Sequence, residues 1–89
     1  MKELKLFGKK GCAKCESTKN KIEHLKKEIS QNFSFDYYDL DTLDGLTEGS
    51  YYGVYQIPTT IIVENGIVVK RWEGIIPPTE ELLEILERG

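Results

Sequence analysis

The alternation of apolar and polar residues divides the chain into seven predicted elements. Residues 2–7 alternate often enough to indicate a strand. A stripe of positions spaced three and four residues apart then predicts a helix over residues 13–30. The inward face of this helix consists of Cys15, Thr18, Ile22, Leu25 and Ile29.

The rest of the chain follows the same two periodicities. It predicts strands at 33–40, 59–63 and 67–72, a short helix at 43–53, and a last helix at 80–87. Asn65-Gly66 suits a tight hairpin turn between the last two strands, because both residues tolerate positive φ. Thr79 is expected to cap the last helix, and Gly74 to break the chain before it.

The element order β-α-β-α-β-β-α predicts an α/β fold. A right-handed helical crossover should make the first two strands parallel, and the hairpin makes the last two antiparallel. The expected architecture is therefore a four-stranded mixed sheet with helices on both faces. We expect one domain over residues 1–89, since 89 residues suffice for one small domain.

Composition narrows the classes of function. With 39% hydrophobic and 30% charged residues, the chain is expected to be globular. A net charge of -3 argues against general nucleic-acid binding, although nine of the twelve basic residues lie within the first 27 positions. No apolar run approaches the roughly 20 residues of a membrane span, and no signal peptide is evident. We therefore expect a cytoplasmic protein that has no membrane association.

Cys12 and Cys15 are the only cysteines of the chain, and they lie where a strand passes into a helix. In the cytoplasm such a pair is more often catalytic or metal-binding than structural. The helical stripe turns Cys15 inward, whereas Cys12 precedes the first turn and is expected to be exposed. A helix N-terminus favours the Cys12 thiolate, and Lys9, Lys10 and Lys14 add positive charge. Cys12 would then attack a disulfide and Cys15 would resolve the mixed disulfide.

Three segments, in order, resemble the thioredoxin-fold family in its short glutaredoxin-like form. They are Cys12-Ala13-Lys14-Cys15 after a strand, Tyr52-Gly53-Val54-Tyr55-Gln56-Ile57-Pro58-Thr59, and the Asn65-Gly66 hairpin followed by Gly74. The resemblance covers essentially the whole chain. It implies a thioredoxin fold, thiol–disulfide oxidoreductase activity, and a cis peptide bond before Pro58.

By this resemblance, the loop of Ile57, Pro58 and Thr59 packs against the cysteines and contacts substrate. A proline without an amide hydrogen lets the neighbouring backbone face a substrate. Lys9 matches a lysine that glutaredoxins often carry three residues before the first cysteine, and Lys14 lies between the cysteines. We therefore predict Ile57, Pro58, Thr59, Lys9 and Lys14 as substrate-binding residues.

The chain departs from both branches of the family. Leu6 stands where thioredoxins have a buried aspartate, so the proton relay attributed to that aspartate is absent or comes from elsewhere. Gly11 replaces the tryptophan before the first cysteine of thioredoxins. Ile75 and Ile76 replace polar residues of the glutaredoxin glutathione site, which argues against glutathione binding without removing it as an alternative.

The leading prediction is a monomeric dithiol oxidoreductase without a resident cofactor. Its partners would be disulfide-containing proteins and a reductase; glutathione and a flavoprotein remain alternative electron donors. A second class is a dimeric protein that binds a metal or an iron–sulfur cluster, because one C-x-x-C supplies two of the usual four ligands. A monomeric site would need His24 and a further group. A third class is a non-catalytic interaction module, which the intact cysteine pair and Pro58 disfavour.

Overall fold

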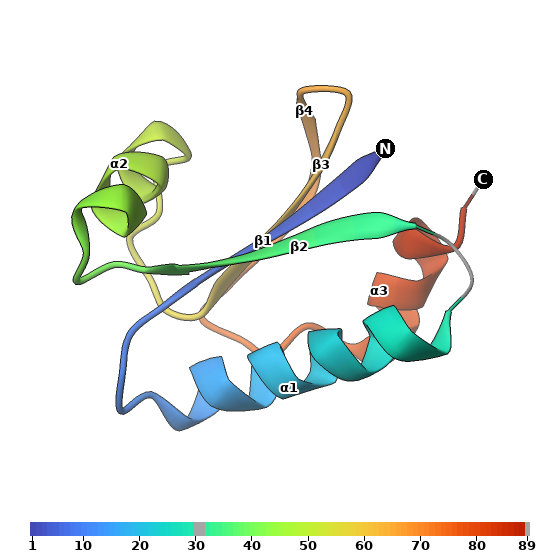
Figure 1. Ribbon diagram of the computed structural model, residues 1–89, viewed down its shortest axis with the longest axis horizontal. Helices are drawn as coiled ribbons and strands as arrows, with labels where there is room; N and C mark the ends of the chain where they lie inside the picture. The colour runs from blue at the N-terminus through green and yellow to red at the C-terminus, as the bar shows by residue number, and fades with distance from the viewer. Residues whose placement is uncertain (30–31, 89) are drawn as a thin grey trace.

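In the part of the chain that the structure describes, three helices pack around one mixed sheet (Figure 1). The computed structural model describes residues 1–29 and 32–88. The elements follow the predicted order, with some shifted ends. They are β1 (Lys2–Gly8), α1 (Ala13–Glu28), β2 (Phe33–Asp39), α2 (Leu43–Tyr51), β3 (Thr59–Glu64), β4 (Ile67–Glu73) and α3 (Thr79–Leu86).

The strand order β2-β1-β3-β4 confirms the predicted mixed sheet. Strand β1 lies in the centre, parallel to β2 and antiparallel to β3, and β3 and β4 form the antiparallel hairpin. The hairpin turns at Asn65 and Gly66, whose φ angles are 53° and 81°. Both residues adopt the left-handed conformation that a tight hairpin of this kind requires.

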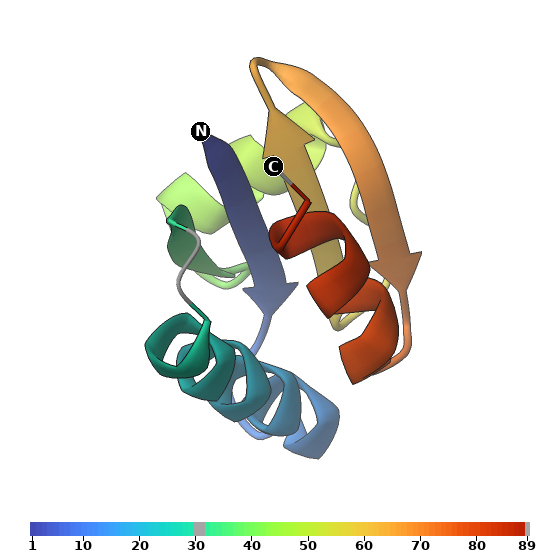
Figure 2. The same ribbon diagram turned by 90° about the vertical axis from the view of Figure 1, so that its right-hand side faces the viewer.

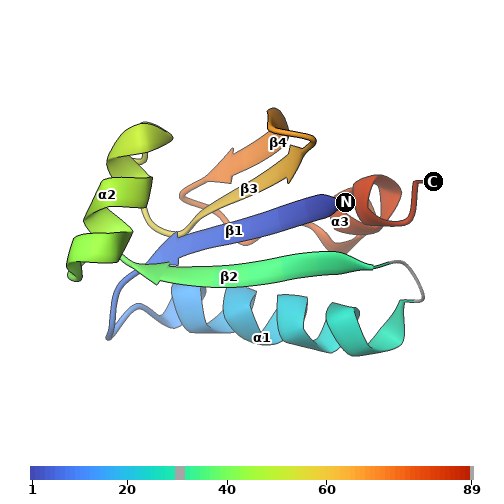
Figure 3. The same cartoon turned by 45° about the horizontal axis from the view of Figure 1, so that its top comes forward.

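Helices cover both faces of the sheet, as expected (Figures 2 and 3). Helices α1 and α3 share one face with the larger apolar cluster, to which β1 contributes Leu4 and Leu6 and β4 contributes Trp72. On the other face a smaller cluster forms around Phe7 and Ile61, near the end of α2. Strand β3, which is buried from Thr59 to Val63, contributes alternate residues to the two clusters, and this fits a central strand.

Helix α1 buries the predicted stripe at Cys15, Thr18, Ile22 and Leu25. The helix ends at Glu28, earlier than predicted, because Ile29 already has extended backbone angles (φ -92°, ψ 148°). The Ile29 side chain is partly buried against the larger cluster. Ser30, which was predicted to end the helix, lies outside the described residues.

The start of α3 corrects the expected cap. Pro78 occupies the N-cap position and Thr79 is the first helical residue, so no side chain caps this helix. Helix α3 is instead joined to the sheet by its first turn, where Trp72 Nε1 donates a hydrogen bond to Glu81 Oε1 at 2.8 Å. None of the helices in the described part of the chain is long and apolar enough to cross a membrane.

Strand β1 is buried on both faces, so even its lysines are largely covered. Lys5 is 8% exposed, and its ammonium group lies 3.4 Å from the Tyr38 hydroxyl and 3.7 Å from Glu48 Oε2. Burial by itself lowers the pKa of Lys5, but the interactions with Tyr38, Tyr52 and Glu48 outweigh it and raise the pKa above its ordinary value. The charged lysine is therefore satisfied on the α2 face of the sheet.

Two matched leucine substitutions test this description of the core. Leu82 in α3 is fully buried, whereas Leu43 in α2 is 80% exposed. Leu82→Ala should lower the free energy of unfolding by about 2–5 kcal/mol, because it removes buried methyl groups and leaves a cavity. Leu43→Ala should change it by less than about 0.5 kcal/mol. Urea unfolding of both variants measures the difference; equal effects would contradict the packing of α3.

Candidate functional site

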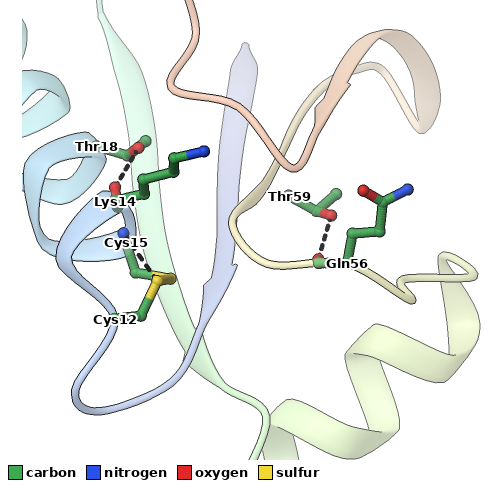
Figure 4. Close-up of a disulfide and its surroundings, with 6 residues drawn as sticks. All are labelled: Cys12, Lys14, Cys15, Thr18, Gln56 and Thr59. Atoms are coloured by element: carbon green, nitrogen blue, oxygen red, sulfur yellow. Dashed lines mark hydrogen bonds between the residues drawn. A yellow bond between two sulfur atoms is a disulfide. The ribbon is translucent and has the colours of Figure 1, made fainter.

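The two cysteines form a disulfide across the first turn of α1 (Figure 4). Their Cα atoms are 5.2 Å apart. Cys12 is the N-cap residue of the helix, and its sulfur accepts a hydrogen bond from the backbone N–H of Cys15 at 3.1 Å. A helix N-terminus leaves backbone N–H groups without intrahelical partners and carries partial positive charge. The Cys12 sulfur therefore lies where negative charge on sulfur is stabilised.

The two sulfur-bearing residues differ in burial, as the helical stripe predicts. Cys15 is 1% exposed, whereas Cys12 is only partly covered. Cys15 lies on the same face of α1 as Thr18, and the Thr18 hydroxyl donates to the Lys14 carbonyl oxygen at 2.8 Å. An external disulfide can therefore reach Cys12 but not Cys15.

Gly8, at the end of β1, fixes how closely α1 approaches the sheet. A Cβ atom at this position would lie 2.8 Å from Cys15 Sγ and 2.9 Å from both Cys15 Cβ and the Tyr37 hydroxyl oxygen. Such distances are too short for real contacts, so Cys15 packs directly on the backbone of Gly8. Leu6, two residues before Gly8 on β1, is fully buried and apolar, as the sequence indicates.

The loop before β3 lies at the same end of the sheet as the cysteines. Thr59 pairs with Phe7, which directly precedes Gly8, because β1 and β3 are antiparallel. The Ile57–Pro58 bond is cis, as the resemblance predicts. Two hydrogen bonds shape this loop: the Thr59 hydroxyl donates to the Gln56 carbonyl at 2.6 Å (Figure 4), and the Gly74 N–H donates to the Pro58 carbonyl at 2.8 Å.

Lys9 and Ile57 line one groove of about 340 Å³ beside this loop. The other lining residues come from the turn after β2, from α2 and from the segment after α2: Leu40, Leu46, Gly49, Ser50, Val54 and Tyr55. Tyr55 is 92% exposed, which indicates a surface position. Pro58 and Thr59 are buried at the edge of this region. The structure thus brings Lys9 and Ile57 together in one groove.

The lysines around the disulfide lie at different positions. Lys9 Nζ is 3.8 Å from Asp41 Oδ1, in an exposed ion pair. Such pairs contribute little energy because water and salt screen them. The exposed Lys14 side chain extends away from the two sulfur atoms in Figure 4. Both lysines therefore contribute to the positive field around the helix start rather than direct contacts to sulfur.

Gly8 and Tyr37 lie close to Cys15, but the sequence did not predict them as residues of the site. Tyr37 lies on the α1 face of β2, partly buried against the larger cluster. The alternation of Phe33, Phe35 and Tyr37 with more polar neighbours could have placed its ring on that face. Its proximity to Cys15 could not be read from the pattern, because it depends on how α1 is seated.

The described residues contain no group of three or more histidine, cysteine, aspartate or glutamate side chains placed to hold a metal ion. His24 is on the outer surface of α1, where its Nε2 lies 3.7 Å from Glu28 Oε1. It is therefore paired within its own helix and not directed to the cysteines.

Replacing Gly8 tests the close approach of α1 to the sheet. Gly8→Ala should lower the free energy of unfolding by about 1–3 kcal/mol, because the new methyl group overlaps Cys15 and forces the helix outward. Ser17→Ala, on the exposed face of the same helix, should change it by less than about 0.5 kcal/mol. Chemical unfolding of the oxidised proteins checks both; a neutral Gly8→Ala variant would show that α1 has room to move.

Solved structures of known proteins share this fold. The chain is similar to thioredoxin-2 of the malaria parasite, with a TM-score of 0.83 and 19% identity over 100% of this chain and 84% of that one. The chain is also similar to a mutant thioredoxin from Halobacterium salinarum, with a TM-score of 0.80 and 22% identity over 97% of this chain and 72% of that one. Its similarity to oxidised thioredoxin O2 from Arabidopsis thaliana has a TM-score of 0.84 and 16% identity over 99% of this chain and 76% of that one. At these identities the likeness establishes the fold alone.

Sequence comparison establishes the family. None of the curated proteins matches the chain. The thioredoxin domain family, however, matches residues 2–87, which is nearly the whole chain. This match agrees with the fold and with a C-x-x-C disulfide at the start of α1. The chain therefore belongs to the thioredoxin domain family and carries that family's redox-active cysteine pair.

Proposed function

We propose that this protein is a dithiol oxidoreductase that reduces disulfides of other proteins. The observation that carries the proposal is the asymmetry of the cysteine pair. Cys12 is accessible and its sulfur accepts the Cys15 N–H, whereas Cys15 is 1% exposed. One cysteine is placed to attack an external disulfide, and the other to act only within the chain.

The proposed reaction has two exchange steps. The Cys12 thiolate attacks one sulfur of the substrate disulfide, and the other substrate sulfur leaves as a thiolate and takes up a proton. The Cys15 thiol then loses its proton and its sulfur attacks Cys12 Sγ. The second substrate sulfur leaves with the electron pair of the broken bond and is protonated, so the substrate is reduced to a dithiol and Cys12–Cys15 is oxidised.

The groove beside Ile57 is the proposed binding site for the substrate polypeptide. It opens next to the cis-Pro58 loop and is lined by Lys9 and by the apolar side chains of Leu40, Leu46, Val54 and Ile57. An extended segment around a substrate cysteine could contact the Ile57 backbone while its disulfide meets Cys12. The apolar lining favours apolar neighbours of that cysteine, and Lys9 favours an acidic one.

Cysteine variants separate the two proposed roles. Cys12→Ser should abolish insulin disulfide reduction with dithiothreitol as donor, since no nucleophile remains at the surface. Cys15→Ser should accumulate a mixed disulfide between Cys12 and its substrate, which mass spectrometry would detect. Retained turnover in Cys12→Ser would contradict the proposal. Stoichiometric metal or cluster in the purified protein, together with no turnover, would favour the metal-binding alternative instead.

The position of Cys12 at the helix start predicts an acidic thiol. Its pKa in the reduced protein should lie below the value of about 8.5 for a free cysteine, because the Cys15 N–H and the helix N-terminus stabilise the thiolate. The pH dependence of iodoacetamide alkylation measures this pKa, with Cys12→Ser as the control for the buried Cys15. A Cys12 pKa at or above that of free cysteine would contradict the assigned role.

A further inference from the structure

The second exchange step needs a Cys15 thiolate in a place that disfavours charge. Cys15 is 1% exposed and packs on Gly8, above a sheet in which Leu6 is fully buried. Burial among apolar groups raises the pKa of a thiol, because the charged form loses its hydration. The step therefore requires a polar group near the Cys15 sulfur, and Leu6 offers none.

One row across the sheet contains the candidates. Tyr37, Leu6, Thr60 and Trp72 are register partners on β2, β1, β3 and β4. Tyr37, Leu6 and Trp72 all pack in the cluster on the α1 and α3 face. Trp72 Nε1 is already bonded to Glu81. Two side-chain hydroxyls in the row remain, those of Tyr37 and Thr60.

The backbone of Gly8 locates the Tyr37 hydroxyl beside Cys15. A Cβ atom built on Gly8 would lie 2.8 Å from Cys15 Sγ and 2.9 Å from the Tyr37 hydroxyl oxygen. The sulfur of α1 and the hydroxyl of β2 therefore converge on the same small space over Gly8. A side chain on Gly8 would fill that space and separate them, so the glycine keeps the two groups together.

The surroundings of Tyr37 favour the neutral phenol. Burial raises the pKa of the Tyr37 hydroxyl above its ordinary value, and the carboxylates of Asp39 on its own strand and Glu16 on α1 raise it further. Lys19 of α1 lies over the ring, with Nζ 5.3 Å from the ring centroid. The facing segment of β1 contributes Leu6 and Gly8, which do not titrate. Tyr37 therefore keeps its proton at neutral pH and is available as a hydrogen-bond donor.

We propose that the Tyr37 hydroxyl donates a hydrogen bond to the Cys15 sulfur as the Cys15 thiolate forms. This inference rests on the proposed function and concerns its second step. The Cys15 proton passes to solvent, the thiolate attacks Cys12 Sγ, and the departing substrate sulfur takes up a proton. Tyr37 keeps its own proton throughout, so it stabilises the attacking sulfur and positions it without being consumed.

The pKa of Cys15 tests the inference without any turnover. In reduced protein carrying Cys12→Ser, the Cβ resonance of Cys15 reports its titration by NMR. Adding Tyr37→Phe should raise this pKa by about one unit, because the thiolate loses one charge-assisted hydrogen bond. Tyr38→Phe is the matched control: Tyr38 packs on Phe7, in the cluster on the opposite face, and should leave the pKa of Cys15 unchanged.

Single-turnover kinetics tests the consequence for exchange. Reaction of the reduced protein with 5,5′-dithiobis(2-nitrobenzoate) loads Cys12 and releases one thionitrobenzoate, and Cys15 then releases a second. Tyr37→Phe should slow the second release about threefold near neutral pH and leave the first unchanged, because the tenfold smaller thiolate fraction is partly offset by the higher nucleophilicity of a more basic thiolate. The difference should shrink once the pH exceeds the Cys15 pKa of the variant. A slower first release would instead indicate damage to Cys12.

Three results would overturn the inference. The first is an equal Cys15 pKa in the Cys12→Ser protein with and without Tyr37→Phe. The second is a shift of the Cys15 pKa by Tyr38→Phe that is as large as the shift by Tyr37→Phe. The third is a shift of the Cys15 pKa by Thr60→Val but not by Tyr37→Phe. This result would assign the role to Thr60, whose Oγ1 is buried without a hydrogen-bond partner among the described residues. If Tyr37→Phe does not fold, the Tyr37 Cζ resonance of the reduced Cys12→Ser protein decides, since it should move with the Cys15 titration. If the unsubstituted protein does not reduce insulin but Tyr37→Phe raises the Cys15 pKa as expected, only the proposed function is rejected.

Discussion

The contact between Cys15 and Gly8 is the constraint on which the rest of the site depends. Because Gly8 has no side chain, the first turn of α1 rests directly on the end of β1. This contact buries Cys15, directs Cys12 outward, and holds the helix start where the Cys15 N–H reaches the Cys12 sulfur. A larger residue at position 8 would change all three together.

The sheet topology then collects the other parts of the site at one end. Strands β1 and β2 are parallel, so both end there, while the antiparallel β3 begins there. The cysteines follow β1, α2 follows β2, and cis-Pro58 precedes β3. One groove beside these segments is lined by Lys9 after β1, by Leu40 and residues of α2 after β2, and by Ile57 before β3, so none of the segments could form it alone.

Most of the fold could be predicted from periodicity, and the errors have local physical causes. The stripe that begins at Cys15 predicted α1, but hydrophobic spacing does not show where backbone angles change, so its end at Glu28 was missed. At α3, threonine is a common N-cap residue, yet the fixed φ of Pro78 already suits the position before the first turn. Of the site, the cysteines, Pro58 and Leu6 could be identified from their positions along the chain, whereas Tyr37 could not.

The sequence by itself determined which chemistry this protein carries. Helical periodicity places Cys15 on the inward face of an amphipathic helix, and Cys12 precedes the first turn of that helix, so one sulfur is directed inward and the other outward. Only the tertiary structure decided what surrounds those sulfurs. The Tyr37 hydroxyl and the Cys15 sulfur both lie next to the position that a Cβ atom of Gly8 would occupy, because a parallel strand pair and the packing of α1 on the sheet bring them there. Contacts of that kind depend on packing between elements, which no local pattern specifies.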